Sequence, residues 1–139
     1  MRDSHLANQR KAVRLPEAAD RFLAAPHIGV FTTSRPDGSS HSVPVRFSWD
    51  GESGLIRVMT TNSRVKTRNV RYGNGRRVSM CQAVDFRWIT LEGVASVLSD
   101  PERVAEGKRR YQRRYLSPPP DVSGMVVIEI KVDRVMGLW

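Results

Sequence analysis

Hydrophobic and polar residues alternate along several short segments of this chain, which is typical of strands with one buried face. In the clearest segment, residues 42–49, Val43, Val45, Phe47 and Trp49 occupy every second position. Pro and Gly residues stand where tight turns would join neighbouring strands. The pattern predicts six strands, at 28–33, 42–49, 55–61, 78–84, 87–98 and 126–132.

Two other segments show helical spacing and predict helices at 16–25 and from about residue 101 to Pro118, and the turn residues Tyr72 to Gly75 indicate the end of a helix between them, at 64–71. Asn62-Ser63 is a candidate cap for the second helix, and Ser99 to Glu102 resembles a capping box with a proline in the first turn. In the third helix Tyr111 and Tyr115 share a face. We expect them to face the core and the arginines of 108–114 to face solvent.

The order of these elements is helix, three strands, helix, two strands, helix and strand. Strands that follow each other through short turns favour an antiparallel sheet. We therefore predict a mainly β (α+β) fold, a small six-stranded antiparallel β-barrel, closed or split, with two to three short helices, since closure removes exposed edges. Pro44 inside a strand indicates a sheet edge. Residues 1–14 lack periodicity and are expected to form a flexible arm before a single domain at 15–139.

The composition adds a strong positive charge to this picture. The 139 residues hold 23 Lys and Arg against 14 Asp and Glu, a net charge of +9, and this favours an anionic partner. Only 7% of the residues are aromatic, which argues against an RNA-binding module. The sequence has no signal peptide and no apolar run long enough for a membrane span, so we expect a cytoplasmic protein without membrane or nucleic-acid partners.

The sequence offers little for catalysis by side chains alone. Cys81 is the only cysteine and stands among apolar residues, where a small buried side chain is expected, and the three histidines lack metal-ligand spacing. We therefore predict no metal site. The informative segment is 60–69, where hydroxyls, an amide and three cations gather at a strand-to-helix junction. Such a junction suits a bound phosphate, and an exposed basic helix start is the alternative.

Taken together, these segments resemble the pyridoxamine 5′-phosphate oxidase-like split β-barrel family, in its branch of reductases that use the deazaflavin F420. Within that branch the chain is most similar to the biliverdin reductase-like members. The likeness spans about residues 15–137. It is carried by Val43-Pro44-Val45, Thr60-Thr61, Lys66 with Asn69, Cys81-Gln82, Arg87-Trp88, Leu91-Glu92-Gly93, Tyr111 with Arg114-Tyr115, Pro118 with Pro120, and Val126-Val127-Ile128-Glu129.

The resemblance implies a homodimer with cofactor sites at the subunit interface. It implies that Arg64, Lys66 and Asn69 bind the cofactor phosphate. Further cofactor-binding residues by the same resemblance are Val43, Pro44 and Val45 along the deazaflavin ring, Thr60, Thr61, Ser63 and Thr67 near the phosphate, and Gln82 and Trp88 near the ring or its phosphodiester. No residue is assigned as catalytic.

The implied activity is a hydride transfer from reduced F420 to a small conjugated acceptor, with biliverdin as the first candidate. The cofactor would supply the reactive carbon, so the protein need only position its reactants. Two alternatives remain open at this point. One is an oxidoreductase that binds flavin mononucleotide (FMN) at the same junction, and the other is a carrier of a cofactor or tetrapyrrole without turnover.

Overall fold

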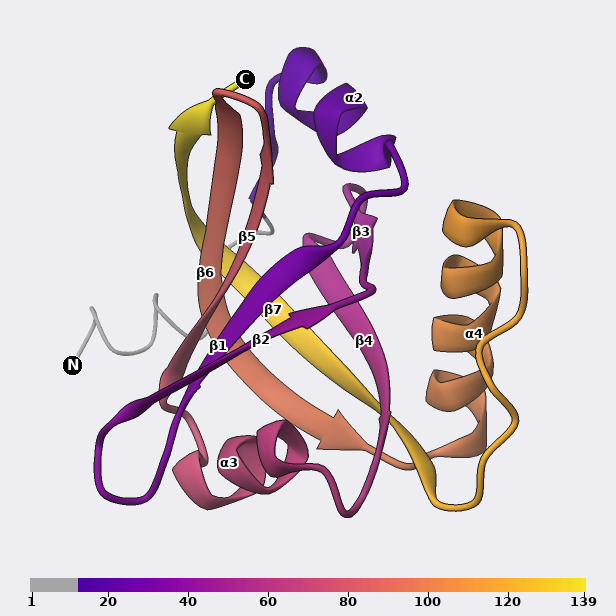
Figure 1. Ribbon diagram of the computed structural model, residues 1–139. Coiled ribbons are helices and arrows are strands. Elements are labelled where there is room, and N and C mark those ends of the chain that lie inside the picture. The colour runs from indigo at the N-terminus through magenta and orange to yellow at the C-terminus, as the bar shows by residue number, and fades with distance from the viewer. Residues whose placement is uncertain (1–12) are drawn as a thin grey trace, which may run out of the picture.

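The computed structural model describes residues 13–139, which fold into one strongly curled antiparallel sheet with three helices around it (Figure 1). The helices are α2 (Glu17–Ala24), α3 (Val65–Gly73) and α4 (Pro101–Tyr115). The strands are β1 (Gly29–Ser34), β2 (Ser40–Val45), β3 (Ser48–Asp50), β4 (Leu55–Thr61), β5 (Arg77–Val84), β6 (Arg87–Leu98) and β7 (Met125–Leu138). The predicted fold class is confirmed.

The strand order is β2-β1-β5-β6-β7-β4-β3, and every neighbouring pair is antiparallel. The first and last strands in this order, β2 and β3, follow each other in the chain through residues 46 and 47. The sheet therefore curls back on itself. Pro44 lies in β2, the end strand next to β1, so its predicted place at an edge is confirmed.

The strand count was wrong by one, because the segment predicted as one strand at 42–49 is divided into β2 and β3. Residues 46 and 47 form a bend outside the sheet ladder. At this bend the backbone N–H of Phe47 donates a hydrogen bond to the hydroxyl of Tyr115, at 3.0 Å. A side chain from α4, 68 residues away in sequence, thus replaces the partner that a continuous strand would need.

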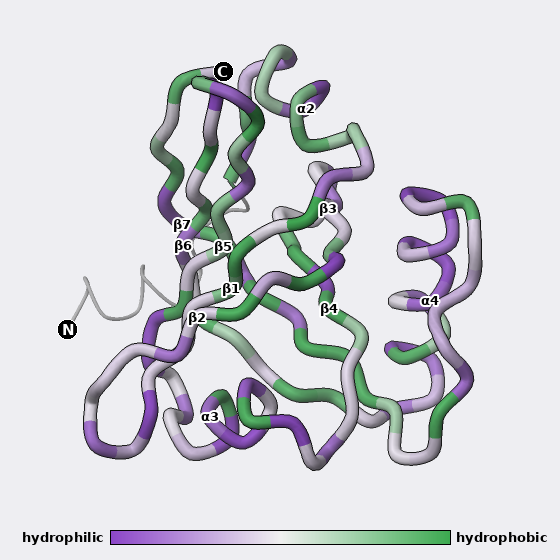
Figure 2. Tube along the Cα trace, in the orientation of Figure 1, coloured by the Kyte–Doolittle hydropathy of each residue, from purple (hydrophilic) through white to green (hydrophobic). Residues whose placement is uncertain are grey.

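The core lies inside the curl of the sheet. Its largest fully buried side chains include Phe31, Phe47, Met80, Ile89 and Ile128. Figure 2 shows that hydrophobic residues concentrate in the strands, whereas α4 is mainly hydrophilic. The two longest strands, β6 and β7, run the length of the sheet and pair beyond Val132, where the sequence had predicted the last strand to end.

The helix ends differ from the sequence prediction. Arg64 is the N-cap of α3 and Asp100 that of α4, and neither cap residue makes a side-chain capping bond. The expected caps at Asn62-Ser63 and Ser99 to Glu102 were therefore wrong, although Pro101 does occupy the first helical turn. Both helices are held by contacts with strands instead: α3 packs on β1 and β6, and α4 on β3, β4 and β7.

The expectation that the arginines of 108–114 face solvent was wrong for Arg110 and Arg114. Arg114 donates hydrogen bonds to the Leu23 carbonyl, to the His27 carbonyl at 3.0 Å and to Gln82 Oε1 at 2.9 Å. Arg110 lies 3.2 Å from Asp50 and 2.8 Å from Glu106. These partners come from segments remote in sequence, so helical spacing alone gave no sign of them.

The arm predicted at residues 1–14 lies outside the described residues except for its last two positions, and there Val13 packs against the core. Cys81 was predicted as buried, but it is only half-buried on β5. Across residues 13–139, no helix combines the length and the apolar character that crossing a membrane requires.

Candidate functional site

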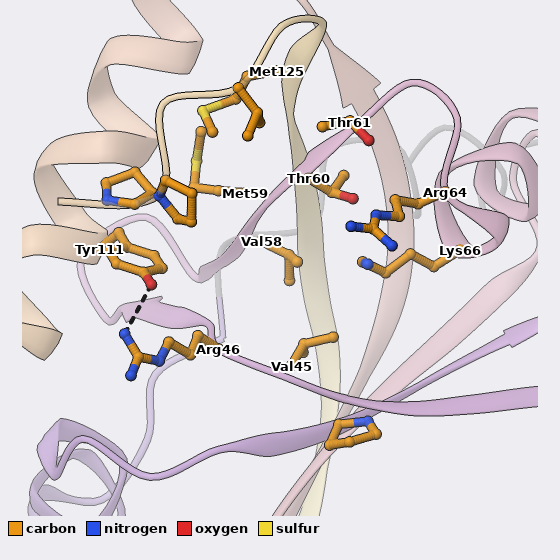
Figure 3. Close-up of a pocket in the computed structure, with 14 residues that line it drawn as sticks. Val45, Arg46, Val58, Met59, Thr60, Thr61, Arg64, Lys66, Tyr111 and Met125 are labelled. Carbon is orange, nitrogen blue, oxygen red and sulfur yellow. Dashed lines mark hydrogen bonds between the residues drawn. The ribbon is translucent and has the colours of Figure 1, made fainter.

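A pocket of about 320 Å³ opens between the β2–β3 bend, β4, the start of α3, α4 and the segment that follows α4 (Figure 3). Its volume is within the usual range of small-molecule sites. Its lining side chains are apolar, hydroxyl-bearing or cationic, and none is acidic. The pocket is therefore suited to an anionic ligand with a sizeable apolar part.

Two cations enter the pocket from the junction of β4 and α3. Arg64 and Lys66 both point into it in Figure 3. Neither has a carboxylate partner among residues 13–139, and the first turn of α3 holds no acidic residue. Burial and the neighbouring positive charge of Arg64 lower the pKa of Lys66. An anion bound here would relieve this repulsion, and the free N–H groups of the helix start would add to its binding.

Two buried side chains fix the position of α3. The Thr67 hydroxyl is fully buried and donates to Thr60 Oγ1 at 3.4 Å, while Asn69 Nδ2 donates to Thr33 Oγ1 at 3.0 Å. The first bond ties the helix to β4, and the second ties it to β1. Together they hold the first turn of α3, and with it Arg64 and Lys66, against the pocket.

An apolar wall separates these cations from the far side of the pocket. Pro44 and Val45 come from β2, Val58 from β4, and Met125 from the start of β7. Proline has no backbone N–H, so at residue 44 the edge of the sheet presents no donor to a ligand. This wall can pack against a flat ring.

The far side of the pocket carries a third cation, Arg46. Its Nη1 donates to the Tyr111 hydroxyl at 2.9 Å, and its guanidinium lies 5.7 Å from the Tyr111 ring centre and 4.8 Å from that of Tyr115. Figure 3 shows Arg46 and Tyr111 across the pocket from Arg64 and Lys66. Arg46 also has no carboxylate partner among the described residues.

Two acidic residues near α4, Glu106 and Glu129, are engaged by arginines outside the pocket. Glu106 pairs with Arg109 at 2.6 Å and with Arg110 at 2.8 Å, and these two arginines lower the pKa of Glu106 to about 2. Glu129 pairs with Arg103 at 2.6 Å. The three pocket cations therefore remain available for a ligand.

The structure brings half of the sequence-predicted binding residues to the pocket. Those that line it are Pro44, Val45, Thr60, Thr61, Arg64 and Lys66. Val43 packs on the core, Ser63 is exposed beside Thr61, and Thr67 and Asn69 act from behind the lining, as described above. None of these four lines the pocket.

The structure places Gln82 and Trp88 away from the pocket. Gln82 is buried, donates to the Phe22 carbonyl at 2.8 Å and accepts from Arg114, so its amide joins α2 to α4. Trp88 is 37% exposed and pairs with Leu138 near the end of β7. Within one chain, therefore, neither Gln82 nor Trp88 lies where it would contact a ligand in this pocket.

Sequence reasoning missed several lining residues. Arg46 is in the alternating segment, and only the bend after Val45 turns it to the pocket. Tyr111 was predicted to face the core, yet its hydroxyl reaches the pocket through the bond to Arg46. Of the two prolines after α4 that belong to the resemblance, Pro118 and Pro120, only Pro120 lines the site, together with its neighbour Pro119. No local pattern predicts these contacts, because the residues come from separate elements.

Comparison with known proteins gives consistent results. The family model described as pyridoxamine 5′-phosphate oxidase matches residues 15–138. An F420H2-dependent biliverdin reductase of Mycobacterium tuberculosis is 37% identical over 132 residues, which are 95% of this chain and 94% of that protein. A solved structure named F420 reductase is 27% identical with a TM-score of 0.68, covering 88% of this chain and 98% of that one.

A conserved hypothetical protein of Mycobacterium tuberculosis shares the fold with a TM-score of 0.75 at 23% identity. The match covers 93% of this chain and 88% of that one. At this level of identity the likeness concerns the fold alone. It agrees with the split-barrel architecture.

Proposed function

From the premise that this chain belongs to the pyridoxamine 5′-phosphate oxidase family, we propose that it is an F420-dependent reductase. The observation that carries the proposal is the pocket without an acidic residue, in which three cations lack a carboxylate partner among residues 13–139 and two of them lie at the junction of β4 and α3. The relative of known activity, 37% identical over nearly the whole chain, supports the choice of F420. When bound, a reduced deazaflavin supplies a hydride.

In this proposal the residues of this chain bind the cofactor and orient it. Arg64 and Lys66 would hold the phosphate, with Thr60 and Thr61 as hydroxyl partners beside them. Pro44, Val45 and Val58 would line the ring and keep water from that side of it. The proposed acceptor is a conjugated molecule such as biliverdin, which the M. tuberculosis relative reduces according to its name. The pocket's apolar wall and cationic ends suit a flat acceptor with acidic side groups.

The cofactor assignment is tested by titrating the pure protein with F420 and, separately, with FMN while following cofactor fluorescence. We expect saturable binding of F420 that is clearly tighter than that of FMN. Tighter binding of FMN would instead support a flavin oxidoreductase, because the same junction accepts either phosphate.

The acceptor assignment is tested by mixing protein, reduced F420 and biliverdin without air and following bilirubin in the visible spectrum. We expect bilirubin to form only with all three components. Binding of F420 and biliverdin without any bilirubin would favour a carrier over a reductase. Turnover driven by a nicotinamide alone would contradict the proposal.

We also propose that the protein is a homodimer. Successive ladder partners Pro44, Val30, Cys81, Thr90 and Met136 form a row across the outer face of the sheet. The face bears large apolar side chains at high exposure, among them Val30 at 44% and Met136 at 39%. Exposed apolar clusters of this kind mark interaction surfaces, and Pro44 connects this face with the pocket. A second copy packed here would border each cofactor site.

Val30→Glu and Met136→Glu are each expected to shift the protein toward monomer in light scattering, because a carboxylate would be buried at the interface. Leu116→Asn is the matched control. Leu116 is 87% exposed at the end of α4, away from the sheet face, and asparagine tolerates its left-handed backbone (φ 59°). A wild-type monomer at micromolar concentration that binds F420 tightly would contradict this proposal.

A further inference from the structure

We infer that Arg46, held by Tyr111, is a second anion site at the far side of the pocket and takes a carboxylate. This inference rests on the proposed function only for the identity of the ligand. The cavity then has two cationic ends, Arg64 with Lys66 at one and Arg46 at the other, with the apolar wall of Val45 and Val58 between them. A ligand that fills the cavity carries one anion at each end.

The geometry of Arg46 fits a binding group better than a structural one. The Tyr111 hydroxyl accepts one guanidinium N–H, and two tyrosine rings lie within 6 Å of the guanidinium carbon. These contacts fix the side chain and leave its other N–H groups without a protein partner among residues 13–139. Arginine has five N–H donors in a planar fork that matches a carboxylate. The orientation is thus prepared before a ligand binds.

The surrounding charges support the same conclusion by contrast. Arg110 and Arg103, two arginines of α4, are each neutralised by a carboxylate of the chain, at 3.2 Å from Asp50 and 2.6 Å from Glu129. Arg46 has no such partner although it shares the pocket with two other cations. An unpaired cation at this place adds to the positive potential of the pocket, which attracts a ligand carboxylate.

Two ligand carboxylates could reach Arg46: a propionate of the tetrapyrrole acceptor or a carboxylate of the cofactor's tail. The test compares wild-type protein with Arg46→Ala, Arg46→Lys and Tyr111→Phe. Arg113→Ala is the matched control, because Arg113 is an exposed arginine of α4 outside this pocket. Biliverdin and its dimethyl ester serve as probes, since the ester keeps the conjugated system and lacks the charges. Calorimetric binding of each probe to the cofactor-free protein needs no turnover.

If the acceptor supplies the carboxylate, Arg46→Ala weakens biliverdin binding at least about tenfold, the scale of a charge-assisted hydrogen bond. Binding of the dimethyl ester then changes less than about twofold, and Arg113→Ala alters neither. Arg46→Lys keeps the charge without the fork and gives an intermediate loss, as does Tyr111→Phe, which frees the guanidinium. In the loaded enzyme the same variants raise KM for biliverdin more than they lower kcat.

If the cofactor supplies the carboxylate, Arg46→Ala instead weakens F420 binding by a similar factor and leaves both probes unaffected. Either result supports the carboxylate site and identifies its ligand. Unchanged binding of biliverdin and of F420 in folded Arg46→Ala overturns the inference. Failure of the proposed function is a separate result, namely wild-type protein that does not bind F420 at all, and the biliverdin and ester comparison still decides the role of Arg46 in that case.

Discussion

Lys66→Ala is expected to weaken F420 binding by about 1.5–3 kcal/mol, which corresponds to roughly 10- to 150-fold in Kd. The reason is that Lys66 is half-buried in the pocket without a carboxylate partner, so its charge serves a ligand and no ion pair of the chain. The double variant with Arg64→Ala should lose more, because both unpaired cations of the junction are removed. Fluorescence titration with F420 measures both effects.

Arg68→Ala is the matched control for this experiment. Arg68 is an exposed cation of the same helix, and it does not line the pocket. We expect its affinity for F420 to stay within about twofold of wild type at moderate salt. Wild-type affinity for F420 in a folded Lys66→Ala protein would contradict the assignment of a phosphate site to the junction of β4 and α3.

The lowered pKa of Lys66 adds a pH dependence with a definite sign. Burial, with the repulsion of Arg64, favours the neutral amine, so Lys66 releases its proton at a lower pH than an ordinary lysine. Phosphate binding favours the charged form. F420 affinity should therefore decrease as the pH rises through this lowered pKa, and the decrease should disappear in Lys66→Ala.

The second large effect concerns stability, and we expect Arg57→Met to destabilise the fold by about 3–5 kcal/mol. Arg57 is 7% exposed and lies between two buried carboxylates, 3.0 Å from Asp50 and 3.5 Å from Glu129. Its removal leaves both carboxylates buried with one arginine partner each, Arg110 and Arg103. These remaining partners place the expected loss near the lower end of that range. Urea unfolding measures it.

Arg21→Met provides the comparison, because it breaks the ion pair of Arg21 with Glu17 on the surface of α2, at 2.8 Å. Exposed pairs contribute at most about 1 kcal/mol, so this variant should unfold nearly as wild type does. An equal, small loss in both variants would show that the buried charges of β3, β4 and β7 do not hold the sheet together.

The same cluster has a pH dependence that Arg57→Met should reduce. Burial tends to raise the pKa of Asp50, but hydrogen bonds from Arg57 and Ser53 outweigh it and lower the pKa below 3.8. A carboxyl with a lowered pKa in the folded state stabilises the fold above its unfolded pKa, and that contribution is lost as the pH falls. The free energy of unfolding should thus decrease on acidification below about pH 4 in wild type, and less so in Arg57→Met.

Much of the fold was predictable from local pattern. Strand β4 and strand β6 begin and end where the sequence predicted, and Pro44 was placed at an edge because proline cannot donate to a ladder. The cationic junction was also predictable, since Arg64 and Lys66 are neighbours in sequence and lie at the start of a helix that the sequence predicted there. Their entry into one pocket is consistent with that interpretation.

The features that local pattern missed depend on partners distant in the chain. At the break between β2 and β3, the hydroxyl of Tyr115 accepts a hydrogen bond from the backbone of the connecting segment. Arg114 points inward because it donates hydrogen bonds to backbone carbonyls of α2 and of the α2–β1 connection. The local sequence pattern of each affected segment does not indicate its distant hydrogen-bond partner. The caps of α3 and α4 were overpredicted for the related reason that tertiary packing holds those helices without capping bonds.

The sequence by itself determined the antiparallel strands, the edge position of Pro44 and the cationic junction, because each depends on residues close together in the chain. Only the tertiary structure decided that Arg46 and Tyr111 meet across the pocket from that junction. They are 65 residues apart and come together because α4 packs on β3 and β4. The physical reason is that hydrophobic periodicity in the sequence indicates which face of a helix or strand is buried. It does not indicate which elements pack together, and a binding site depends on that packing.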